Sequence, residues 1–413
     1  MQTPSHGRPG NGVVRTQRQQ GRFGQCRDGA DGQAGVNRRL DIAFVVHDYH
    51  RHGGHSRYVA ELARRYRHQH EVHVYCHRVD DADTAGIRFH HVPAWRATAL
   101  ASILSFVIPA TVLVGRHDIV HAQGLCGLRH NMATAHLVTP AWWRARREHE
   151  GRSTWKGWLA DTLISPLERA ALAGHGVKRV IAVSRLTAAD ISRHHGRTKG
   201  VCVIPHGTDV EQFHPRWRAT ARPELLSRLG LPDSAVLALF AGNLQKGAQE
   251  AVETVATVPG AYLLLASPSD PAEVLARAAH LGVGDRVHML GFTRELYKWM
   301  AASDLLLFPT FFDTFGLVIL EAMACALPVI TTRKAGAADL VAHGQTGWLV
   351  DDPRDIAGMA QGLRKLVEQP GLRKQIGMAG RAVAERRTWD AVAEETMAVY
   401  QQLASMMPGM EKG

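Results

Sequence analysis

Short apolar runs alternate with helical patterns along most of this chain, and this alternation limits the possible fold more than any other feature. Residues 42–46 form the first apolar run, and apolar residues at helical spacing follow it from Tyr58 to Tyr66. A run without polar residues suits a strand of a parallel sheet, because such a strand is buried on both faces. Strands that alternate with helices build a parallel α/β sheet. We therefore predict the α/β class with doubly wound sheets.

The alternation occurs twice, which predicts two such domains in tandem. Strands are predicted at residues 42–46, 72–75, 87–92, 118–121, 180–183, 201–204, 236–240, 262–266, 287–290, 305–308 and 329–331. A length of 413 residues also suits two domains of roughly 150–200 residues each. Two doubly wound domains leave a cleft between the carboxyl ends of their sheets, where folds of this kind bind ligands.

Changes in composition mark the expected boundaries of the domains. We predict a disordered basic tail at residues 1–38, because it is rich in Gly, Gln and Arg and lacks the apolar core of a secretory signal. The first domain then covers 39–215 and the second 216–385, with a linker at the Arg- and Pro-containing residues 213–223. The last amphipathic helix lies within residues 386–413, and we expect it to pack back toward the N-terminal domain.

Glycines follow the first predicted strand of each half. Gly53 and Gly54 follow the first, and Gly242-Asn-Leu-Gln-Lys-Gly follows the second. Glycine at a strand-to-helix turn lets a ligand approach the backbone and the helix N-terminus. A plain turn has the same composition, but Lys246 favours a phosphate site because an ammonium group neutralises a diphosphate. Neither turn matches G-x-G-x-x-G or the P-loop, so a nicotinamide enzyme is disfavoured.

The sequence Asp-Thr-Phe-Gly-Leu-Val-Ile-Leu-Glu starts at Asp313 and ends at Glu321. Apolar spacing from Leu317 onward predicts a helix, so that the N–H groups of Phe315, Gly316 and Leu317 would point into the cleft at its positive end. A carboxylate fixed in a cleft can accept two hydrogen bonds from sugar hydroxyls. The alternative is that Asp313 caps the helix and Glu321 is a solvated helix residue.

These motifs resemble those of family 4 of the retaining glycosyltransferases, which have the GT-B fold of two Rossmann-like domains facing across a cleft. The family's E-x7-E motif is matched by Asp313, Phe315-Gly316, Glu321-Ala-Met-Ala and Ala326-Leu-Pro-Val. Further matches in the same order are Gly53-Gly54, residues 203–207, Gly242 with Lys246-Gly247, and residues 346–350. The resemblance covers residues 40–405 and is strongest to the branch that includes lipopolysaccharide-core glucosyltransferases.

The resemblance implies a role for each matched residue. Glu321 would hold the ribose hydroxyls of the donor nucleotide, Asp313 hydroxyls of the transferred sugar, and Lys246 the leaving diphosphate. His136 lies where the family has a histidine near the reacting sugar. The implied catalytic residues are His136, Lys246 and Asp313. The implied donor-binding residues are Gly53, Gly54, Gly242, Asn243, Lys246, Phe315, Gly316, Leu317 and Glu321.

Three positions depart from the family pattern. Asp313 stands where Glu is usual, which shortens its reach by one methylene and bears on the choice of donor sugar. Asn243 stands where Arg is common, so one cation near the phosphates is missing unless Arg333 or Lys334 replaces it. Ala326 stands where Gly is usual.

The resemblance implies retaining, metal-independent transfer of a hexose-type sugar from a UDP- or GDP-sugar to a glycan or lipid-linked acceptor, in the synthesis of cell-surface polysaccharide or glycolipid. No cofactor and no metal is expected beyond the nucleotide-sugar co-substrate. Alternatives are a non-catalytic nucleotide-sugar binder, a nucleotide-sugar epimerase or a phosphorylase. The five Cys form no C-x-x-C pair, which favours reduced thiols in a cytoplasmic protein.

The formal net charge of +11 favours anionic partners. No nucleic-acid-binding motif is present, so we expect no nucleic-acid partner. Residues 142–158 combine Trp and Arg, as in a segment that contacts an acidic membrane at the inner face of the cell membrane; the alternative is an ordinary surface segment. The apolar residues 98–115 are short for a membrane span and contain Pro109, so we predict a buried core helix there.

Overall fold

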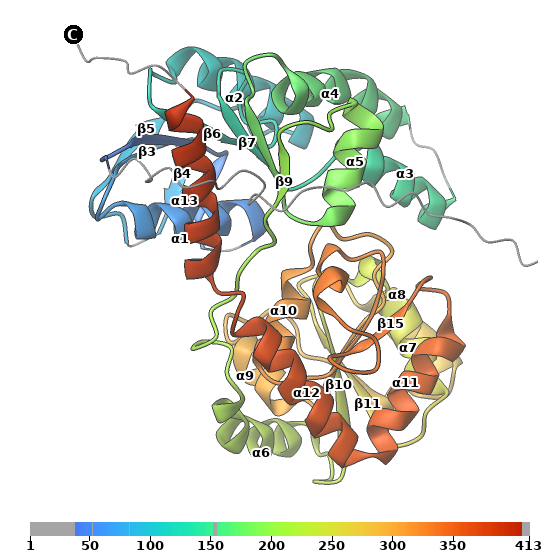
Figure 1. Cartoon of the computed structure of the whole chain (residues 1–413). Helices are drawn as coiled ribbons and strands as arrows, with labels where there is room; N and C mark the ends of the chain where they lie inside the picture. The colour runs from blue at the N-terminus through green and yellow to red at the C-terminus, as the bar shows by residue number, and fades with distance from the viewer. Residues whose placement is uncertain (1–37, 52, 82, 152–154, 407–413) are drawn as a thin grey trace, which may run out of the picture.

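The computed structural model describes residues 38–406 except 52, 82 and 152–154, and the predicted tail at 1–38 therefore lies almost wholly outside the described residues. Two parallel sheets form the centres of two domains, one above the other in Figure 1. The chain is thus α/β with two Rossmann-like domains, as the sequence predicts.

The N-terminal sheet has seven parallel strands in the order β5-β3-β1-β6-β7-β8-β9. Its strands are β1 (Asp41–Val45), β3 (Glu71–Cys76), β5 (Ile87–His91), β6 (Ile119–Gln123), β7 (Met132–Ala135), β8 (Arg179–Ala182) and β9 (Val201–Val203). Its helices are α1 (Gly54–Tyr66), α2 (Ala99–Leu113), α3 (Thr139–Glu150), α4 (Trp155–Ala173) and α5 (Arg185–His195). The short strands β2 (Asp48–His50) and β4 (Arg78–Asp80) pair with each other beside this sheet.

The C-terminal sheet has six parallel strands in the order β12-β11-β10-β13-β14-β15. Its strands are β10 (Val236–Ala241), β11 (Ala261–Ala266), β12 (Val287–Met289), β13 (Leu305–Phe308), β14 (Val329–Thr332) and β15 (Trp348–Val350). Its helices are α6 (Arg218–Leu229), α7 (Ala248–Ala256), α8 (Ala272–His280), α9 (Leu296–Ala302), α10 (Leu317–Ala324), α11 (Ile356–Glu368) and α12 (Pro370–Ala384). Short 3-10 turns are η1 (Pro215–Trp217), η2 (Leu244–Lys246), η3 (Gly284–Arg286) and η4 (Gly336–Leu340).

The predicted linker at 213–223 is wrong in its second part, where α6 begins at Arg218. Two arginines of this segment bind a buried carboxylate of the C-terminal domain. Arg218 and Arg222 bind the two carboxylate oxygens of Asp304 at 2.7 and 2.9 Å, and both also donate to backbone carbonyls of residues 301–303. These contacts fix the segment on the C-terminal domain.

The predicted buried helix at 98–115 is present as α2, but only one side of it is buried. Phe106 and Ala110 lie in the core, whereas Ile108 and Val112 are 69% and 72% exposed. Pro109 is accommodated inside the helix. Within the described residues, none of the helices combines the length and the hydrophobicity that crossing a membrane requires.

The chain crosses between the domains twice, and the two crossings lie side by side. Thr208 forms an isolated parallel bridge with Thr388. Gly207 is needed at this crossing, because a Cβ there would lie 2.5 Å from the backbone of Thr388. After the second crossing, α13 (Trp389–Ser405) lies along α1 (Figure 1). Its residues Trp389 and Tyr400 are part of the core of the N-terminal domain.

Candidate active site

The site is centred on the first turn of α10, which follows the carboxyl end of β13. Gly316 precedes the helix in the left-handed conformation, with φ of 84°. Asp313 Oδ1 accepts a hydrogen bond from the N–H of Phe315 at 3.2 Å, so Asp313 orders the turn from within. No side chain caps the N-terminus of α10, and the dipole of the helix therefore favours an anion there.

Lys246 and Asp313, both predicted to be catalytic, are brought together. Lys246 Nζ lies 2.5 Å from Asp313 Oδ2, and the two side chains are 41% and 13% exposed. Lys246 belongs to η2, which follows β10, and Asp313 belongs to the turn before α10. The ion pair leaves the ammonium group partly open to solvent, where it can meet an anionic ligand.

The loop around Lys246 requires its glycines, whereas Asn243 has a local role. The carbonyl of Pro309 would lie 2.1 Å from a Cβ on Gly247, whose φ is 104°. Gly242 also has a positive φ, of 132°. Asn243 Oδ1 accepts from the N–H of Gln245 at 2.9 Å, so its side chain shapes the turn instead of supplying the cation that the family commonly has here.

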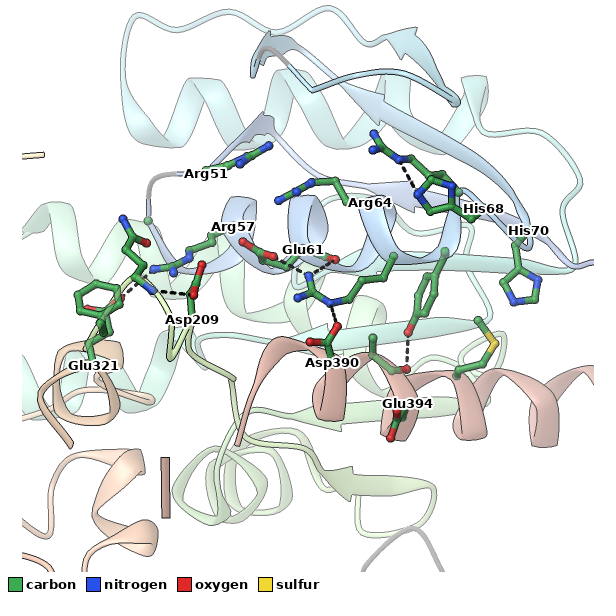
Figure 2. A pocket seen from close by; sticks show the side chains of 18 of the residues that line it. Arg51, Arg57, Glu61, Arg64, His68, His70, Asp209, Glu321, Asp390 and Glu394 are labelled. Atoms are coloured by element: carbon green, nitrogen blue, oxygen red, sulfur yellow. Dashed lines mark hydrogen bonds and ion pairs between the residues drawn. The ribbon is translucent and has the colours of Figure 1, made fainter. Parts of the chain in front are cut away.

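Glu321 is almost buried and is paired with an arginine of the other domain. Arg57 Nη1, on α1, lies 2.8 Å from Glu321 Oε1 on α10, and the side chains are 14% and 9% exposed. The Arg57 guanidinium also lies 5.7 Å from the centre of the Trp389 ring. Figure 2 shows Arg57 turned toward Glu321 at one end of a pocket, with His68 and His70 at the other end.

This pocket has a volume of about 1180 Å³ and is lined by residues from both domains. Gly53 lies at its wall, with φ of 81° at the start of α1, and Gly54 has no heavy atom within 4 Å of where a Cβ would be. Six arginines line the pocket, namely Arg51, Arg57, Arg64, Arg65, Arg67 and Arg294. Five carboxylates line it too, and five of the six arginines form ion pairs with acidic residues, so the pocket holds a network of paired charges that includes Glu321.

His136 belongs to a cluster of rings between the domains. It stacks on His206 with ring centres 5.3 Å apart, and His206 in turn meets the ring of Phe315 edge-on at 5.0 Å. His136 Nε2 lies 2.8 Å from Gln123 Oε1, which accepts, so this nitrogen carries the proton. Its Nδ1 is buried and has no hydrogen-bond partner. His136 thus lies one ring away from the turn that starts α10.

Burial keeps these imidazoles neutral. It places the pKa of His136 well below its usual range, and the neighbouring His206, His55 and His121 add to the shift. Burial, with Arg387 and Arg57 nearby, lowers the pKa of His206 to about 3. At neutral pH His136 can therefore donate from Nε2 and accept at Nδ1, as a hydroxyl ligand requires.

The structure also explains the other positions that depart from the family pattern. Arg333 is turned toward Asp351, at 3.0 Å, and Lys334 contacts the turn through its backbone carbonyl, which accepts from Asp313 N. Ala326 has φ of 58° and is the one non-glycine residue with positive φ in the described part of the chain. This explains why glycine suits the position.

Sequence reasoning overlooked Arg57 and treated His206 only as part of a matching motif. Arg57 lies on the first turn of α1, three residues after Gly54, and this spacing is the signal that points it toward the cleft. The structure gathers Lys246, Asp313 and the turn at Phe315–Leu317 into one place, with Glu321 four residues further along α10.

Solved structures of other proteins share this two-domain architecture. WaaG, a glycosyltransferase involved in lipopolysaccharide biosynthesis, superposes with a TM-score of 0.70 at 22% identity, over 87% of this chain and 99% of that one. Anabaena Alr3699/HepE in complex with UDP-glucose gives a TM-score of 0.65 at 21% identity, over 89% and 99%. The fold is therefore the GT-B fold of glycosyltransferases.

Sequence comparison identifies the family. The model of Glycosyltransferase Family 4 matches residues 52–212, and that of Glycosyl transferases group 1 matches residues 235–369. D-inositol 3-phosphate glycosyltransferase of Xylanimonas cellulosilytica is 34% identical over 236 residues, which are 54% of this chain and 55% of the relative. The chain spans about half the length of the curated relatives it matches first. It belongs to family 4 of the glycosyltransferases.

Proposed function

We propose that this protein transfers a hexose-type sugar from a UDP- or GDP-sugar to a glycan or lipid-linked acceptor, with retention of configuration and without a metal ion. The observation that carries the proposal is that the Lys246–Asp313 ion pair lies next to the uncapped N-terminus of α10. A cation and a positive helix end together suit the charge that develops on a departing diphosphate.

In the proposed reaction, the bond between the sugar C1 and the diphosphate oxygen breaks, and the acceptor oxygen bonds to C1 on the same face. The proton of the acceptor hydroxyl passes to the departing phosphate. Lys246 leaves Asp313 to bind the diphosphate, which frees the Asp313 carboxylate to accept a sugar hydroxyl. Glu321 holds the ribose, and the N–H groups of Gly316 and Leu317 add to the binding of phosphate, whereas the N–H of Phe315, which was also expected to do so, donates to Asp313 Oδ1.

His136 is proposed to position the transferred sugar. Its neutral ring has an unpartnered Nδ1, and it stacks on His206, which contacts Phe315 at the start of α10. A sugar hydroxyl that donates to Nδ1 would satisfy this buried acceptor, which otherwise costs free energy.

We further propose that the protein works in the cytoplasm at the inner face of the membrane, where lipid-linked acceptors lie. Two features support this. Ile108 and Val112 of α2 and Trp158 of α4 are 69%, 72% and 65% exposed. Residues 84–147 contain seven Arg and a single acidic residue, Asp118. This excess of positive charge suits contact with an anionic lipid surface.

Apart from Trp158, the predicted membrane segment at 142–158 gives less support. Trp142 and Trp143 are only partly exposed and both contact Arg146, and the side chains of Trp155 and Lys156 lie outside the described residues. Sedimentation with vesicles tests the proposal: we expect binding to vesicles with acidic phospholipid. Equal binding to zwitterionic vesicles would refute the electrostatic part.

The test of the transferase proposal begins with a thermal-shift panel of UDP-, GDP- and ADP-sugars. A donor at 100 times its Kd should stabilise the protein by about 2.7 kcal/mol. Turnover of that donor, followed by NMR, should release nucleoside diphosphate and form a product with the anomeric configuration of the donor, at the same rate with and without added Mg²⁺ or Mn²⁺. An inverted product or a requirement for these ions would refute the proposed mechanism.

The alternatives predict other products. A non-catalytic binder gives the thermal shift without turnover on any acceptor. An epimerase converts the donor sugar without an acceptor, and a phosphorylase needs inorganic phosphate to split a glycoside. Each outcome is visible in the same NMR experiment.

A further inference from the structure

A second group of polar side chains lies at the opposite edge of the N-terminal sheet from the cleft. Asp41 is the first residue of β1, His73 lies near the start of β3, and His117 lies two residues before β6. These three strands are neighbours in the order β3-β1-β6. Because parallel strands start at the same edge, three side chains from distant parts of the sequence meet there.

The geometry of this group fits a metal ion. One ligand atom of each residue lies within 4.8 Å of those of the other two. Asp41 Oδ1 is 2.7 Å from His117 Nδ1 and 3.6 Å from His73 Nε2. The ligands of a tetrahedral zinc ion, each about 2.0–2.2 Å from the metal, lie roughly 3.3–3.6 Å apart. The distance from Asp41 to His73 matches this separation, whereas Asp41 and His117 form a hydrogen bond that a bound ion would replace by moving them slightly apart.

His73 carries the strongest sign of a missing partner. The residue is 7% exposed, and its Nε2 is buried without a hydrogen bond. This nitrogen lies 3.6 Å from Asp41 and 3.4 Å from Glu71 Oε1. Glu71 Oε1 also pairs with Arg88, and Asp41 Oδ1 with His117, so Nε2 is the atom here that a cation would newly satisfy.

The other nitrogen of each ring is already held. His73 Nδ1 lies 2.8 Å from His90 Nε2, and His117 Nε2 lies 3.1 Å from the hydroxyl of Tyr75. Metal-binding histidines are oriented by such outer contacts, which fix the tautomer and the direction of the ligating nitrogen. The site therefore has an inner and an outer set of groups.

We propose that Asp41, His73 and His117 bind one Zn²⁺, with Glu71 or water as the fourth ligand. Two imidazoles with carboxylate oxygen are ligands of the zinc class, whereas Mg²⁺ and Ca²⁺ require oxygen ligands. The ion ties together the starts of β1, β3 and the segment before β6. Its role is structural, because the sugar-transfer site lies at the carboxyl ends of the strands. Sequence patterns do not show the site, since its ligands come from three separate segments.

The test uses the full chain without a histidine tag, treated with chelator and then dialysed. Titration with Zn²⁺ against a chromophoric chelator should give one site per chain, and Co²⁺ should give the intense visible bands of a four-coordinate ion. Zn²⁺ should raise the Tm. The protein is used at about 1 µM. If it binds no stoichiometric Zn²⁺ when the Zn²⁺ concentration is about 100 times higher, the proposal is overturned.

Variants locate the site. His73→Gln and Asp41→Asn should weaken Zn²⁺ binding more than tenfold and abolish the rise in Tm, and Tyr75→Phe should weaken binding about tenfold through His117. His280→Gln, an exposed histidine of α8, is the matched control and should bind like the wild type. Circular dichroism of the metal-free variants checks that they are folded, and Asp41→Asn retains the shape of the side chain if His73→Gln does not fold. Equal binding by wild type and the folded ligand variants would refute the assignment.

Discussion

The Arg57–Glu321 ion pair joins the two domains, and its energy can be measured. Arg57→Ala leaves the Glu321 carboxylate without its partner in a site where that side chain is 9% exposed. Breaking a buried pair from one side costs about 3–5 kcal/mol, because one charge remains desolvated. Because both side chains are slightly exposed, we expect the lower end of this range: Arg57→Ala should reduce the free energy of unfolding by about 3 kcal/mol.

A double-mutant cycle separates the pair from the other effects of each substitution. We expect Arg57→Ala and Glu321→Gln to be non-additive, with a coupling free energy of about 2 kcal/mol. The matched control is Arg65 with Asp390, which joins the same α1 to α13 at 2.7 Å but leaves Asp390 73% exposed. The cycle of Arg65→Ala and Asp390→Asn should give about 0.2–1 kcal/mol.

The free energies of unfolding for both cycles are measured by urea unfolding followed by circular dichroism. Adding salt should reduce the coupling of the exposed pair more than that of Arg57 and Glu321, because partly buried charges are less screened. If the Arg57–Glu321 coupling is no larger than that of the exposed pair, burial does not strengthen this contact, and the reasoning from exposure is refuted.

Three further predictions concern single residues. Lys246→Ala should lower kcat by about 10²–10³-fold at saturating donor, while Lys298→Ala, on the same domain, should leave it unchanged; an unchanged rate for Lys246→Ala would sink its assignment. Ala326→Gly should stabilise the protein by about 1 kcal/mol by relieving the positive φ, whereas Ala279→Gly in helix α8 should destabilise it by about 0.5–1 kcal/mol. Burial raises the pKa of Asp190 to about 6, so its contribution to stability is lost as pH rises from about 4 through 6. Asp190→Asn should therefore be more stable than the wild type by on the order of 2 kcal/mol at pH 8 and no more stable at pH 3, by urea unfolding.

Much of the fold follows from local sequence because buried parallel strands are continuous apolar runs. All the predicted runs are strands, with ends shifted by a residue or two. The strands β2, β4, β7 and β15 are absent from the prediction. The pattern misses β7 because Met132–Ala135 is short and contains Thr134, whose hydroxyl is satisfied by His121 at 2.6 Å. Such a partner lies in another strand and leaves no trace in the local pattern.

In the candidate site, too, contacts between neighbours in sequence could be predicted and contacts between distant residues could not. The turn from Asp313 to Leu317 could be predicted because its helix start, its glycine and its carboxylate are neighbours in sequence. The pairing of Arg57 with Glu321 could not, since the two residues are 264 positions apart. The same reason hid the partners of the arginines in α6, which composition alone assigned to a linker.

The return of α13 to the N-terminal domain affects how the chain can fold during synthesis. Trp389 and Tyr400 fill a core whose strands are made before the whole C-terminal domain. The N-terminal domain therefore stays incomplete until α13 leaves the ribosome, while the C-terminal domain, a continuous segment between the two crossings, can close earlier. We expect a chain that stops before Trp389 to expose the apolar surface of α1 and to bind chaperones.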